Sequence, residues 1–272
     1  MKFDPTALAR ELLTAADRGL TVPSIASRYL DFDWEEAYRI AAELHRLRTA
    51  RGEAIVGRKI GFTNRGIWPR YRATSPIWAP VYRHTLTDAP RGTARVSLAA
   101  AVNPKIEPEI AFGLRSPIRP GLRDPAKVLA HVKWMAPAFE IVHCHFPYWH
   151  CTPAESVADA ALHFHLVVGR RVPLGVNLAK LVDALSDCRV SLSRAGETMD
   201  IGTGANALDH PALALAHLAD LLAAQPDMPP LAAGEIIATG TLTAALPVKP
   251  GETWSSAFSR IDLPALKVTF TA

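Results

Sequence analysis

The sequence predicts an α+β fold in which a small helical N-terminal part precedes a larger, mostly β domain. Apolar side chains recur at helical spacing in the first fifty residues, whereas the chain after Gly52 carries short apolar runs separated by turns. Two clear helical stretches interrupt those runs. Of the 272 residues, 49% are apolar and 21% are charged, so the chain has the composition of a globular protein with a sizeable core.

Two helices are predicted before Gly52. The first covers roughly 5–18 and ends at Gly19. The second begins after Asp33, whose side chain is suited to cap the helix, and Glu36, three residues later, is placed to close a capping box. Its apolar stripe consists of Ala37, Ile40, Ala41, Leu44 and Leu47.

The chain after Gly52 predicts strands joined by turns. AIVGRKIGF (54–62) is a strand interrupted by glycines, and the proline- and tryptophan-containing stretch 68–80 predicts a long irregular loop. RAGE (194–197) and KPGE (249–252) are typical of turns between strands. Strand-like apolar runs are IAFGL, AFEIVHC, LHFHLVVG, RVSLS, EIIATGTLTAALPV and LKVTFTA.

Two helices are predicted within this β-rich part. They cover 124–132 and 210–225. Pro211 suits the first turn of the second helix, and Pro226 is expected to end it.

Charge and cysteine content limit the partners and the compartment. The formal net charge is +4 and the basic residues are scattered, so we expect no nucleic-acid partner. No uninterrupted apolar stretch is long enough to span a membrane. The three cysteines, Cys144, Cys151 and Cys188, are an odd number, which favours a reducing cytoplasm over a disulfide scaffold.

The stretch KIEPEIAFGL (105–114) places two carboxylates in an apolar strand. Side chains alternate along a strand, so Glu107 and Glu109 share one face, roughly 6–7 Å apart. Like charges in that setting require protonation, basic partners or a divalent cation between them. Ligand sets made of oxygen alone suit Mg²⁺ or Mn²⁺ rather than Zn²⁺.

A metal site also requires a third carboxylate on a neighbouring strand. Glu140 is the best candidate, because it is a single acid in the strand-like run MAPAFEIVHC (135–144). The alternative is that all three glutamates lie on edge strands and face water.

An ordered series of segments connects these residues to a known family. It comprises GRKIGFT (57–63), KIEPEIAF (105–112), AFEIV (138–142), VADAALHFHLVVG (157–169), GANALDHPALALAHLADLL (204–222) and LAAGEIIATGTLTAALPVKPGE (231–252). From about residue 50 the chain resembles the 2-keto-4-pentenoate hydratase and 4-oxalocrotonate decarboxylase group of the fumarylacetoacetate hydrolase (FAH) superfamily. The resemblance implies a mixed β-roll or barrel fold and a homo-oligomer. We therefore expect a helical or α+β N-terminal subdomain over 1–75 and a β-rich catalytic domain over 76–272.

The resemblance also implies the site residues. They fall into metal ligands for Mg²⁺ or Mn²⁺, catalytic groups, and a glycine-rich turn that approaches the substrate. The metal ligands are Glu107, Glu109 and Glu140, and the catalytic groups are Lys59 and Asp159. The turn that approaches the substrate consists of Thr239, Gly240 and Thr241. His143 is a further acid/base candidate, because it closely follows Glu140 and histidine titrates near neutral pH.

The implied activity is that of a metal-dependent lyase. It would hydrate or decarboxylate a small 2-oxo acid from aromatic ring-cleavage catabolism, through an enolate that the metal stabilises as a Lewis acid. Lys59 is suited to stabilise the developing charge or to move a proton, unless it is a surface lysine. Two alternatives are a C–C bond hydrolase of the same superfamily and a non-catalytic binding homologue.

Two segments depart from the family pattern. ADAAL (158–162) stands where Ala-Asp-Asn-Ala-Ser is usual, so an amide and a hydroxyl are missing. SPIWAPVY (75–82) replaces an acidic-Tyr/Phe-Gly stretch. The metal-binding half of the site is therefore better supported than the substrate-binding half, and the sequence does not decide between hydration, decarboxylation and C–C hydrolysis.

Three further patterns are weaker. HCHFPYWHC (143–151) is rich in potential zinc ligands, but it lacks paired ligand spacing and contains Pro147. GTGANA (202–207) resembles a dinucleotide-binding turn without a surrounding βαβ unit. His163 and His165 alternate with apolar residues, which is typical of a polar strand face.

Overall fold

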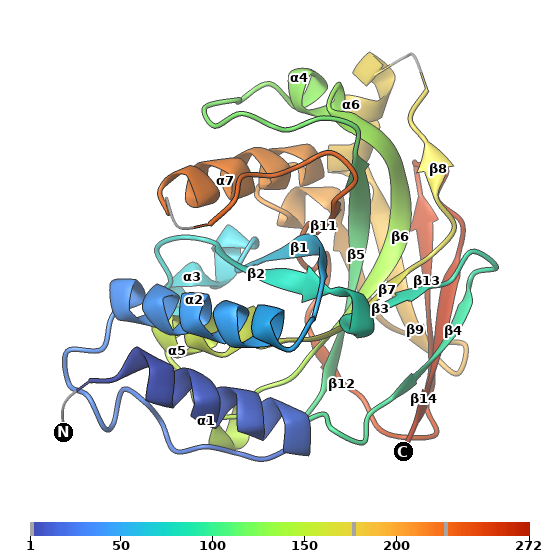
Figure 1. Ribbon diagram of the computed structural model, residues 1–272. Helices are drawn as coiled ribbons and strands as arrows, with labels where there is room; N and C mark the ends of the chain where they lie inside the picture. Colours follow the sequence, from blue (N-terminus) through green and yellow to red (C-terminus); the bar gives the residue numbers. More distant parts are fainter. Residues whose placement is uncertain (1–2, 176–177, 226–227) are drawn as a thin grey trace.

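The computed structural model describes residues 3–175, 178–225 and 228–272. As predicted, the N-terminal part is helical: α1 (Pro5–Arg18) and α2 (Trp34–Ala50) pack against each other (Figure 1). The side chains of Asp4 and Asp33 accept hydrogen bonds from backbone N–H groups in the first turns of α1 and α2. Gly19 ends α1 in the left-handed conformation.

The larger of two sheets is mixed, since β1–β11 and β3–β7 pair in parallel and the other neighbours antiparallel. Within the described residues its main strand order is β2-β1-β11-β5-β6-β7-β3, and β12 and β8 pair with β5 and β6. The strands are β1 (Ile55–Gly61), β2 (Ile77–Tyr82), β3 (Leu86–Asp88), β5 (Lys105–Leu114), β6 (Val132–Val142), β7 (His163–Val168), β8 (Val172–Pro173), β11 (Ile236–Ala238) and β12 (Leu246–Pro247).

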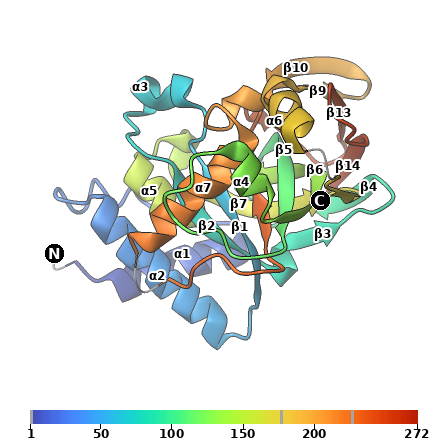
Figure 2. The same cartoon turned by 90° about the horizontal axis from the view of Figure 1, so that it is seen from above.

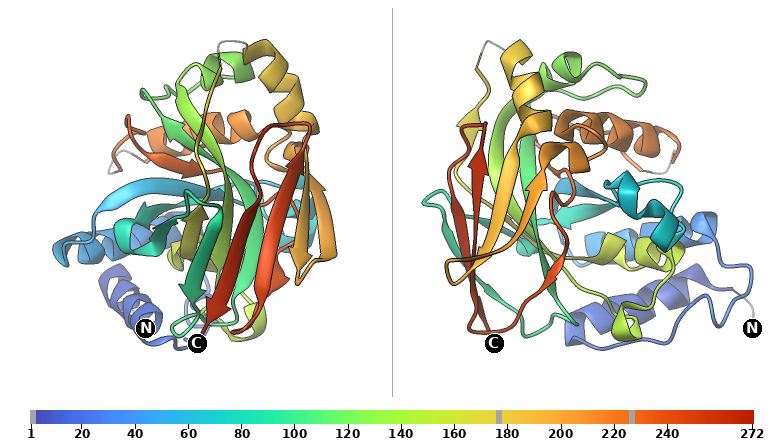
Figure 3. Two further views of the ribbon diagram at one scale, coloured as in Figure 1. Left: turned by 90° about the vertical axis from the view of Figure 1, so that its right-hand side faces the viewer. Right: turned by 180° about the vertical axis from the view of Figure 1, so that it is seen from behind.

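The smaller sheet packs against the outer face of the larger one (Figure 3). Its order is β10-β9-β13-β14-β4, and the predicted RAGE turn joins β9 to β10 while KPGE leads into β13. Phe139 of the larger sheet and Trp254 and Phe270 of the smaller one belong to the apolar cluster between them. The strands are β4 (Thr93–Ser97), β9 (Arg189–Arg194), β10 (Glu197–Thr203), β13 (Thr253–Ser259) and β14 (Leu266–Thr271).

Further helices cover the larger sheet (Figures 1 and 2). α4, α6 and α7 share an apolar cluster with Ile110 and Phe112, whereas α1, α2 and α5 share another with Ile77 and Ala79. The helices are α3 (Trp68–Tyr71), α4 (Pro125–Leu129), α5 (Pro153–Ala158), α6 (Leu178–Asp187) and α7 (Pro211–Ala223). Short 3-10 turns are η1 (Arg65–Ile67), η2 (Arg83–Thr85), η3 (Pro147–Trp149), η4 (Ala160–Leu162) and η5 (Gly204–Asn206).

The larger sheet is curled, because β2 contacts β7 although the two strands stand far apart in the strand order. One face carries small buried side chains, and these leave room for longer polar ones on the same face. The small residues are Ala111, Ala136, Ala138 and Ala238. The same sheet contains β1, which lies in the predicted N-terminal subdomain (1–75), and β5 and β6, which lie in the predicted catalytic domain (76–272).

Several expected elements differ in the structure. The helix predicted over 124–132 is wrong at its end: α4 stops at Leu129, and Val132 already pairs with Leu114 in the sheet. The loop predicted over 68–80 is also wrong, since it contains α3 and most of β2. Pro80 is tolerated there because β2 is the terminal strand of the order.

The sequence did not predict α5 and α6 as helices. The 210–225 helix is confirmed as α7, and Pro226 lies outside the described residues. Among the described helices, none is both long enough and apolar enough to cross a membrane.

Candidate metal centre

The pairing of β5 with β6 brings the three predicted carboxylate ligands together. Glu107 lies directly opposite Glu140, and Glu109 lies opposite Ala138, so all three acids point to one face. One carboxylate oxygen from each glutamate lies within 4.8 Å of one from each of the others. Glu109 and Glu140 are fully buried and Glu107 is half-buried. The alternative in which all three face water is therefore excluded.

The three carboxylates are in different electrostatic states. Burial, followed by the charge of Glu140, raises the pKa of Glu107 to about 7 and that of Glu109 well above its usual value. Burial also acts to raise the pKa of Glu140, but Lys59 and His163 outweigh it and lower that pKa. Glu140 is therefore the most readily ionised carboxylate of the group, and Glu107 and Glu109 hold their protons to higher pH in the absence of a further cation.

The site fits a hard divalent cation. The ligand set consists of carboxylate oxygens, and Glu109 Oε1 is buried with no hydrogen-bond partner among the described residues. Three carboxylates, one dication and the Lys59 ammonium sum to zero charge, which removes the cost of burying the acids alone. Glu107, Glu109 and Glu140 are thus the residues that would hold Mg²⁺ or Mn²⁺.

Lys59 projects from β1 toward the same carboxylates. Its Nζ lies 3.2 Å from Glu140 Oε2 and donates a hydrogen bond of 2.8 Å to the carbonyl oxygen of Ala161. Burial acts to lower the pKa of Lys59, but the three glutamates raise it above its usual value. Lys59 is 3% exposed, so it is a buried ammonium rather than a surface lysine.

The predicted glycine-rich turn contacts Glu109, one of the three candidate metal ligands. Thr239 donates its hydroxyl to the Ile110 carbonyl at 2.8 Å, and the N–H of Gly240 donates to Glu109 Oε2 at 2.9 Å. Gly240 has φ +91°, and a Cβ there would lie 2.1 Å from Thr63 Oγ1. The turn therefore requires glycine in order to hold Glu109. Neighbouring Thr241 donates to the Thr243 carbonyl at 2.9 Å.

Two contacts at the site were missed by the sequence analysis. His163 Nδ1 lies 2.8 Å from Glu140 Oε1, and its Nε2 lies 3.0 Å from Thr85 Oγ1, so the ring is held between them. The alternation around His163 had indicated a polar strand face, but it gave no sign that the ring would contact Glu140. The Ala161 carbonyl had no sequence signal, because its direction depends on three consecutive left-handed residues, 160–162, with φ of 50°, 50° and 64°.

Asp159 and His143 are not hydrogen-bonded to the glutamates in the described part of the chain. Asp159 instead lies 2.6 Å from His145 Nδ1 and accepts the His145 backbone N–H at 3.1 Å. The His143 ring packs 4.2 Å from the His145 ring and 5.0 Å from that of Phe164, measured between centroids. Burial, then the neighbouring histidines, keeps the pKa of His143 well below its usual value, so this ring is neutral.

The histidine- and cysteine-rich segment 143–151 forms no zinc-like cluster. Among the described residues, the three glutamates are the group of acids, histidines or cysteines whose ligand atoms gather closely enough to hold a metal. GTGANA ends β10 and continues into η5, so it does not join a strand directly to a long helix. Neither pattern contributes to the metal centre.

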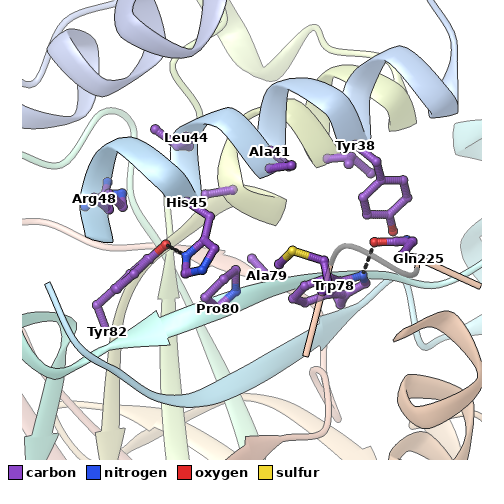
Figure 4. Close-up of a pocket in the computed structure, with 14 residues that line it drawn as sticks. Tyr38, Ala41, Leu44, His45, Arg48, Trp78, Ala79, Pro80, Tyr82 and Gln225 are labelled. Atoms are coloured by element: carbon purple, nitrogen blue, oxygen red, sulfur yellow. Dashed lines mark hydrogen bonds between the residues drawn. The ribbon is translucent and has the colours of Figure 1, made fainter. Parts of the chain in front are cut away.

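A separate pocket lies between α2 and β2 (Figure 4). Its lining is mostly apolar and contains no carboxylate. In this pocket Trp78 Nε1 donates to Gln225 Oε1 at 3.2 Å, and His45 Nδ1 lies 2.9 Å from the Tyr82 hydroxyl. The His45–Tyr82 contact ties α2 to the edge strand β2, and the Trp78–Gln225 bond ties the same strand to the segment after α7. We therefore assign the pocket a packing role.

The curled mixed sheet thus carries two buried carboxylates, one half-buried carboxylate and a buried lysine, in an arrangement that could hold a hard divalent cation. The family model for the C-terminal part of fumarylacetoacetate hydrolase matches residues 81–270. The chain therefore belongs to the fumarylacetoacetate hydrolase family, which confirms the predicted family and fold class.

The similar proteins are enzymes. A 4-oxalocrotonate decarboxylase from Pseudomonas sp. is 32% identical over 234 residues, which is 85% of this chain and 84% of that one. A 2-hydroxyhexa-2,4-dienoate hydratase from Comamonas testosteroni is 32% identical over 89% of each chain. The structure of a 4-oxalocrotonate decarboxylase from Pseudomonas putida G7, complexed with magnesium and adipate, matches with a TM-score of 0.88. It is 26% identical, over 98% of this chain and 97% of that one.

Proposed function

We propose that this protein is a divalent-metal-dependent lyase that hydrates or decarboxylates a small 2-oxo acid from aromatic ring-cleavage catabolism. The observation that carries the proposal is the group of Glu107, Glu109 and Glu140 beside the buried Lys59 ammonium. Similarity to hydratases and decarboxylases over most of the chain supports it. The magnesium and the small dicarboxylate in the related decarboxylase structure support it further.

The metal ligands and Lys59 have separate tasks. The three glutamates would hold Mg²⁺ or Mn²⁺, which would supply Lewis-acid stabilisation of negative charge on the oxygens of a 2-oxo acid. Lys59 provides the adjacent positive charge and a proton at Nζ, and its contacts with Glu140 and Ala161 fix the direction of that atom. The buried surroundings strengthen both effects, because little water screens the charges.

The surroundings of Lys59 make it the preferred proton-transfer group. On β2, Ala79 pairs with Lys59 in the segment where the family usually has an acidic residue. Asp159 binds His145, and His143 is neutral and packed against aromatic rings. Within this proposal, Asp159 positions the His145 segment, and the Thr239–Thr241 turn holds Glu109 next to the substrate.

The proposal extends to a cytoplasmic homo-oligomer. The odd number of cysteines, three, favours a reducing compartment. Met199 and Ile201 are exposed on β10, which is the terminal strand of the smaller sheet among the described residues, and this edge is the candidate contact with another copy. Light scattering after size-exclusion chromatography tests this extension, and a monomer at micromolar concentration would contradict it.

The direct test is turnover of the two substrate types of the relatives. The protein is incubated with 2-oxopent-4-enoate or with 4-oxalocrotonate, in Mg²⁺, Mn²⁺ or EDTA. Formation of the water adduct is followed by proton NMR, and CO₂ release is followed in parallel. We expect metal-dependent turnover of one of the two, which Glu107→Gln abolishes. Full activity in EDTA or in Glu107→Gln would contradict the metal-dependent function.

A third incubation separates the two alternatives. A C–C bond hydrolase would cleave an acylpyruvate to pyruvate and leave both lyase substrates unchanged. A non-catalytic homologue would bind metal and turn over none of the three compounds. The lyase is supported over the hydrolase by the position of His163. The glutamate that it contacts is a candidate metal ligand, so among the described residues this contact supplies no separate His–Glu pair to activate water at the metal.

A further inference from the structure

Two thiols meet on the segment that joins β6 to α5. Cys144 follows the end of β6, and its backbone N–H donates to the Val102 carbonyl at 3.1 Å. Cys151 directly precedes Thr152, whose side chain caps α5. The two sulfur atoms lie 3.8 Å apart, with the Cys144 thiol donating to Cys151 Sγ. Both cysteines are therefore anchored by neighbouring backbone structure and are in direct contact.

The loop between the two cysteines has an uncommon backbone conformation that places the thiols side by side. Tyr148 and Trp149 adopt left-handed conformations, with φ of 56° and 60°, which non-glycine residues seldom do. The Trp149 indole donates to the Asn103 carbonyl at 2.9 Å, and the Lys105 ammonium lies 3.7 Å from the centre of the indole. The loop is thus held in an uncommon conformation by contacts to the segment before β5 and to β5 itself.

The two thiols are chemically unequal. Cys151 is partly exposed and accepts the hydrogen bond from Cys144. That hydrogen bond is the largest influence on the pKa of Cys151 and lowers it. Burial acts to raise this pKa, and the contact with Ser156 lowers it further. Cys144 is fully buried, and its own donation, followed by burial, raises its pKa. Cys151 is therefore the accessible nucleophile, since the thiolate is the reactive form, and Cys144 is the second sulfur.

We propose that Cys144 and Cys151 form a redox-reactive dithiol, which a hydroperoxide converts reversibly into an intramolecular disulfide. The Cys151 thiolate attacks the peroxide, the O–O bond breaks, and water or an alcohol leaves with a proton from solvent. This step leaves a sulfenic acid on Cys151. Cys144 sulfur then attacks Cys151 sulfur, so that an S–S bond forms, the S–O bond breaks, and hydroxide leaves with the Cys144 proton as water. Two electrons pass from the thiols to the peroxide.

The movement that this reaction requires is small. A disulfide has an S–S bond of about 2.05 Å, so the sulfur atoms must approach each other by roughly 1.8 Å. Cys144 is held by Val102, whereas Cys151 lies in irregular backbone between η3 and α5. We therefore expect the Cys151 side to make most of the adjustment.

The chain contains its own control thiol. Cys188 is fully buried in a different apolar cluster, and burial raises its pKa to about 11. It should stay reduced at a peroxide dose that oxidises the pair. Cys188→Ser is accordingly expected to leave the reaction unchanged.

The test counts thiols in the full-length protein. Reduced protein is treated with an equimolar amount of hydrogen peroxide, unfolded, and titrated with a chromogenic thiol reagent. The three thiols should fall to one, a non-reducing peptide map should link residues 144 and 151, and dithiothreitol should restore all three. Because the readout is covalent, it is independent of whether the protein has the proposed lyase activity.

Single variants separate the roles of the two sulfurs. Cys144→Ser should stop at a sulfenic acid on residue 151 that dimedone traps, and Cys151→Ser should form no intramolecular disulfide. Three thiols that remain free after treatment would overturn the proposal. Loss of Cys188 at the same rate as the pair, or a disulfide between two protein molecules, would overturn it as well.

Discussion

Replacing Glu107 by glutamine should stabilise the metal-free protein above neutral pH and abolish its response to Mg²⁺. Burial, then Glu140, raises the pKa of Glu107 from 4.5 to about 7. Between these two values the folded protein binds more protons than the unfolded chain does. The free energy of unfolding therefore falls as pH rises through this window, and the loss is complete above pH 7. Glutamine carries no charge at any pH, so the variant escapes this loss.

The size of the effect follows from the shift in pKa. A change from 4.5 to about 7, at 1.36 kcal/mol for each unit, corresponds to about 3 kcal/mol. Because Glu107 is half-buried and partly screened by water, we expect about 2 kcal/mol. The same carboxylate is a proposed metal ligand, so its loss should remove the stabilisation that bound Mg²⁺ provides.

The assay is urea unfolding in EDTA at pH 4.5 and pH 8, together with thermal unfolding with and without Mg²⁺. Glu197→Gln is the matched control, because Glu197 is exposed on β10. At pH 8 in EDTA, Glu107→Gln should exceed both the wild type and the control in stability, and the difference should shrink toward pH 4.5. If the variant is less stable at pH 8, or if Mg²⁺ raises its Tm as much as that of the wild type, the electrostatic reasoning is wrong.

Three further substitutions test individual contacts. His163→Gln should weaken Mg²⁺ binding by about 10–100-fold in titration calorimetry, because the ring that orients Glu140 is lost. Lys59→Met should abolish turnover and destabilise the metal-free protein by about 3–5 kcal/mol in urea unfolding, because a buried carboxylate loses its partner. Gly240→Ala should destabilise the protein by at least about 1–3 kcal/mol in the same assay, since the new Cβ meets Thr63 at a positive φ.

Each of these expectations has a contradicting result. Unchanged Mg²⁺ affinity in His163→Gln would show that Glu140 needs no orienting partner. Retained turnover in Lys59→Met would remove the lysine from the chemistry. A Gly240→Ala variant of normal stability would show that the turn relaxes. The control is Gly121→Ala, because Gly121 is exposed and has a positive φ but has open space where the new Cβ would lie. This control measures the effect of the backbone conformation alone.

The metal-binding half of the site could be predicted because it follows from strand alternation. Glu107 and Glu109 had to share a face once 105–114 was a strand. Glu140 was the best candidate for the third carboxylate, because it is a single acid in the strand-like run 135–144. The Lys59 strand was predicted from the apolar run 54–62, and the role of Lys59 came from the family resemblance. What the alternation could not show was the register that places Glu107 opposite Glu140, because register depends on the partner strand.

Other parts depended on tertiary contacts and were therefore missed. β2 contains Pro80 and was predicted as loop, since a proline is compatible with a strand only at an edge and the edge position is not visible in the sequence. The carbonyl of Ala161 reaches Lys59 through a left-handed turn without glycine. Such a turn has no sequence signature, because the surrounding packing imposes it.

The most direct test of the metal-dependent 2-oxo acid site is hydrogen exchange at C3 of a saturated analogue, 2-oxopentanoate, in D₂O. Proton NMR follows the loss of the C3 signal in Mg²⁺, in Mn²⁺ and in EDTA. We predict exchange with either metal, none above background in EDTA, and none with Glu107→Gln. Absence of exchange in wild-type protein that is shown to bind the metal, or equal exchange in EDTA, would contradict the proposed function.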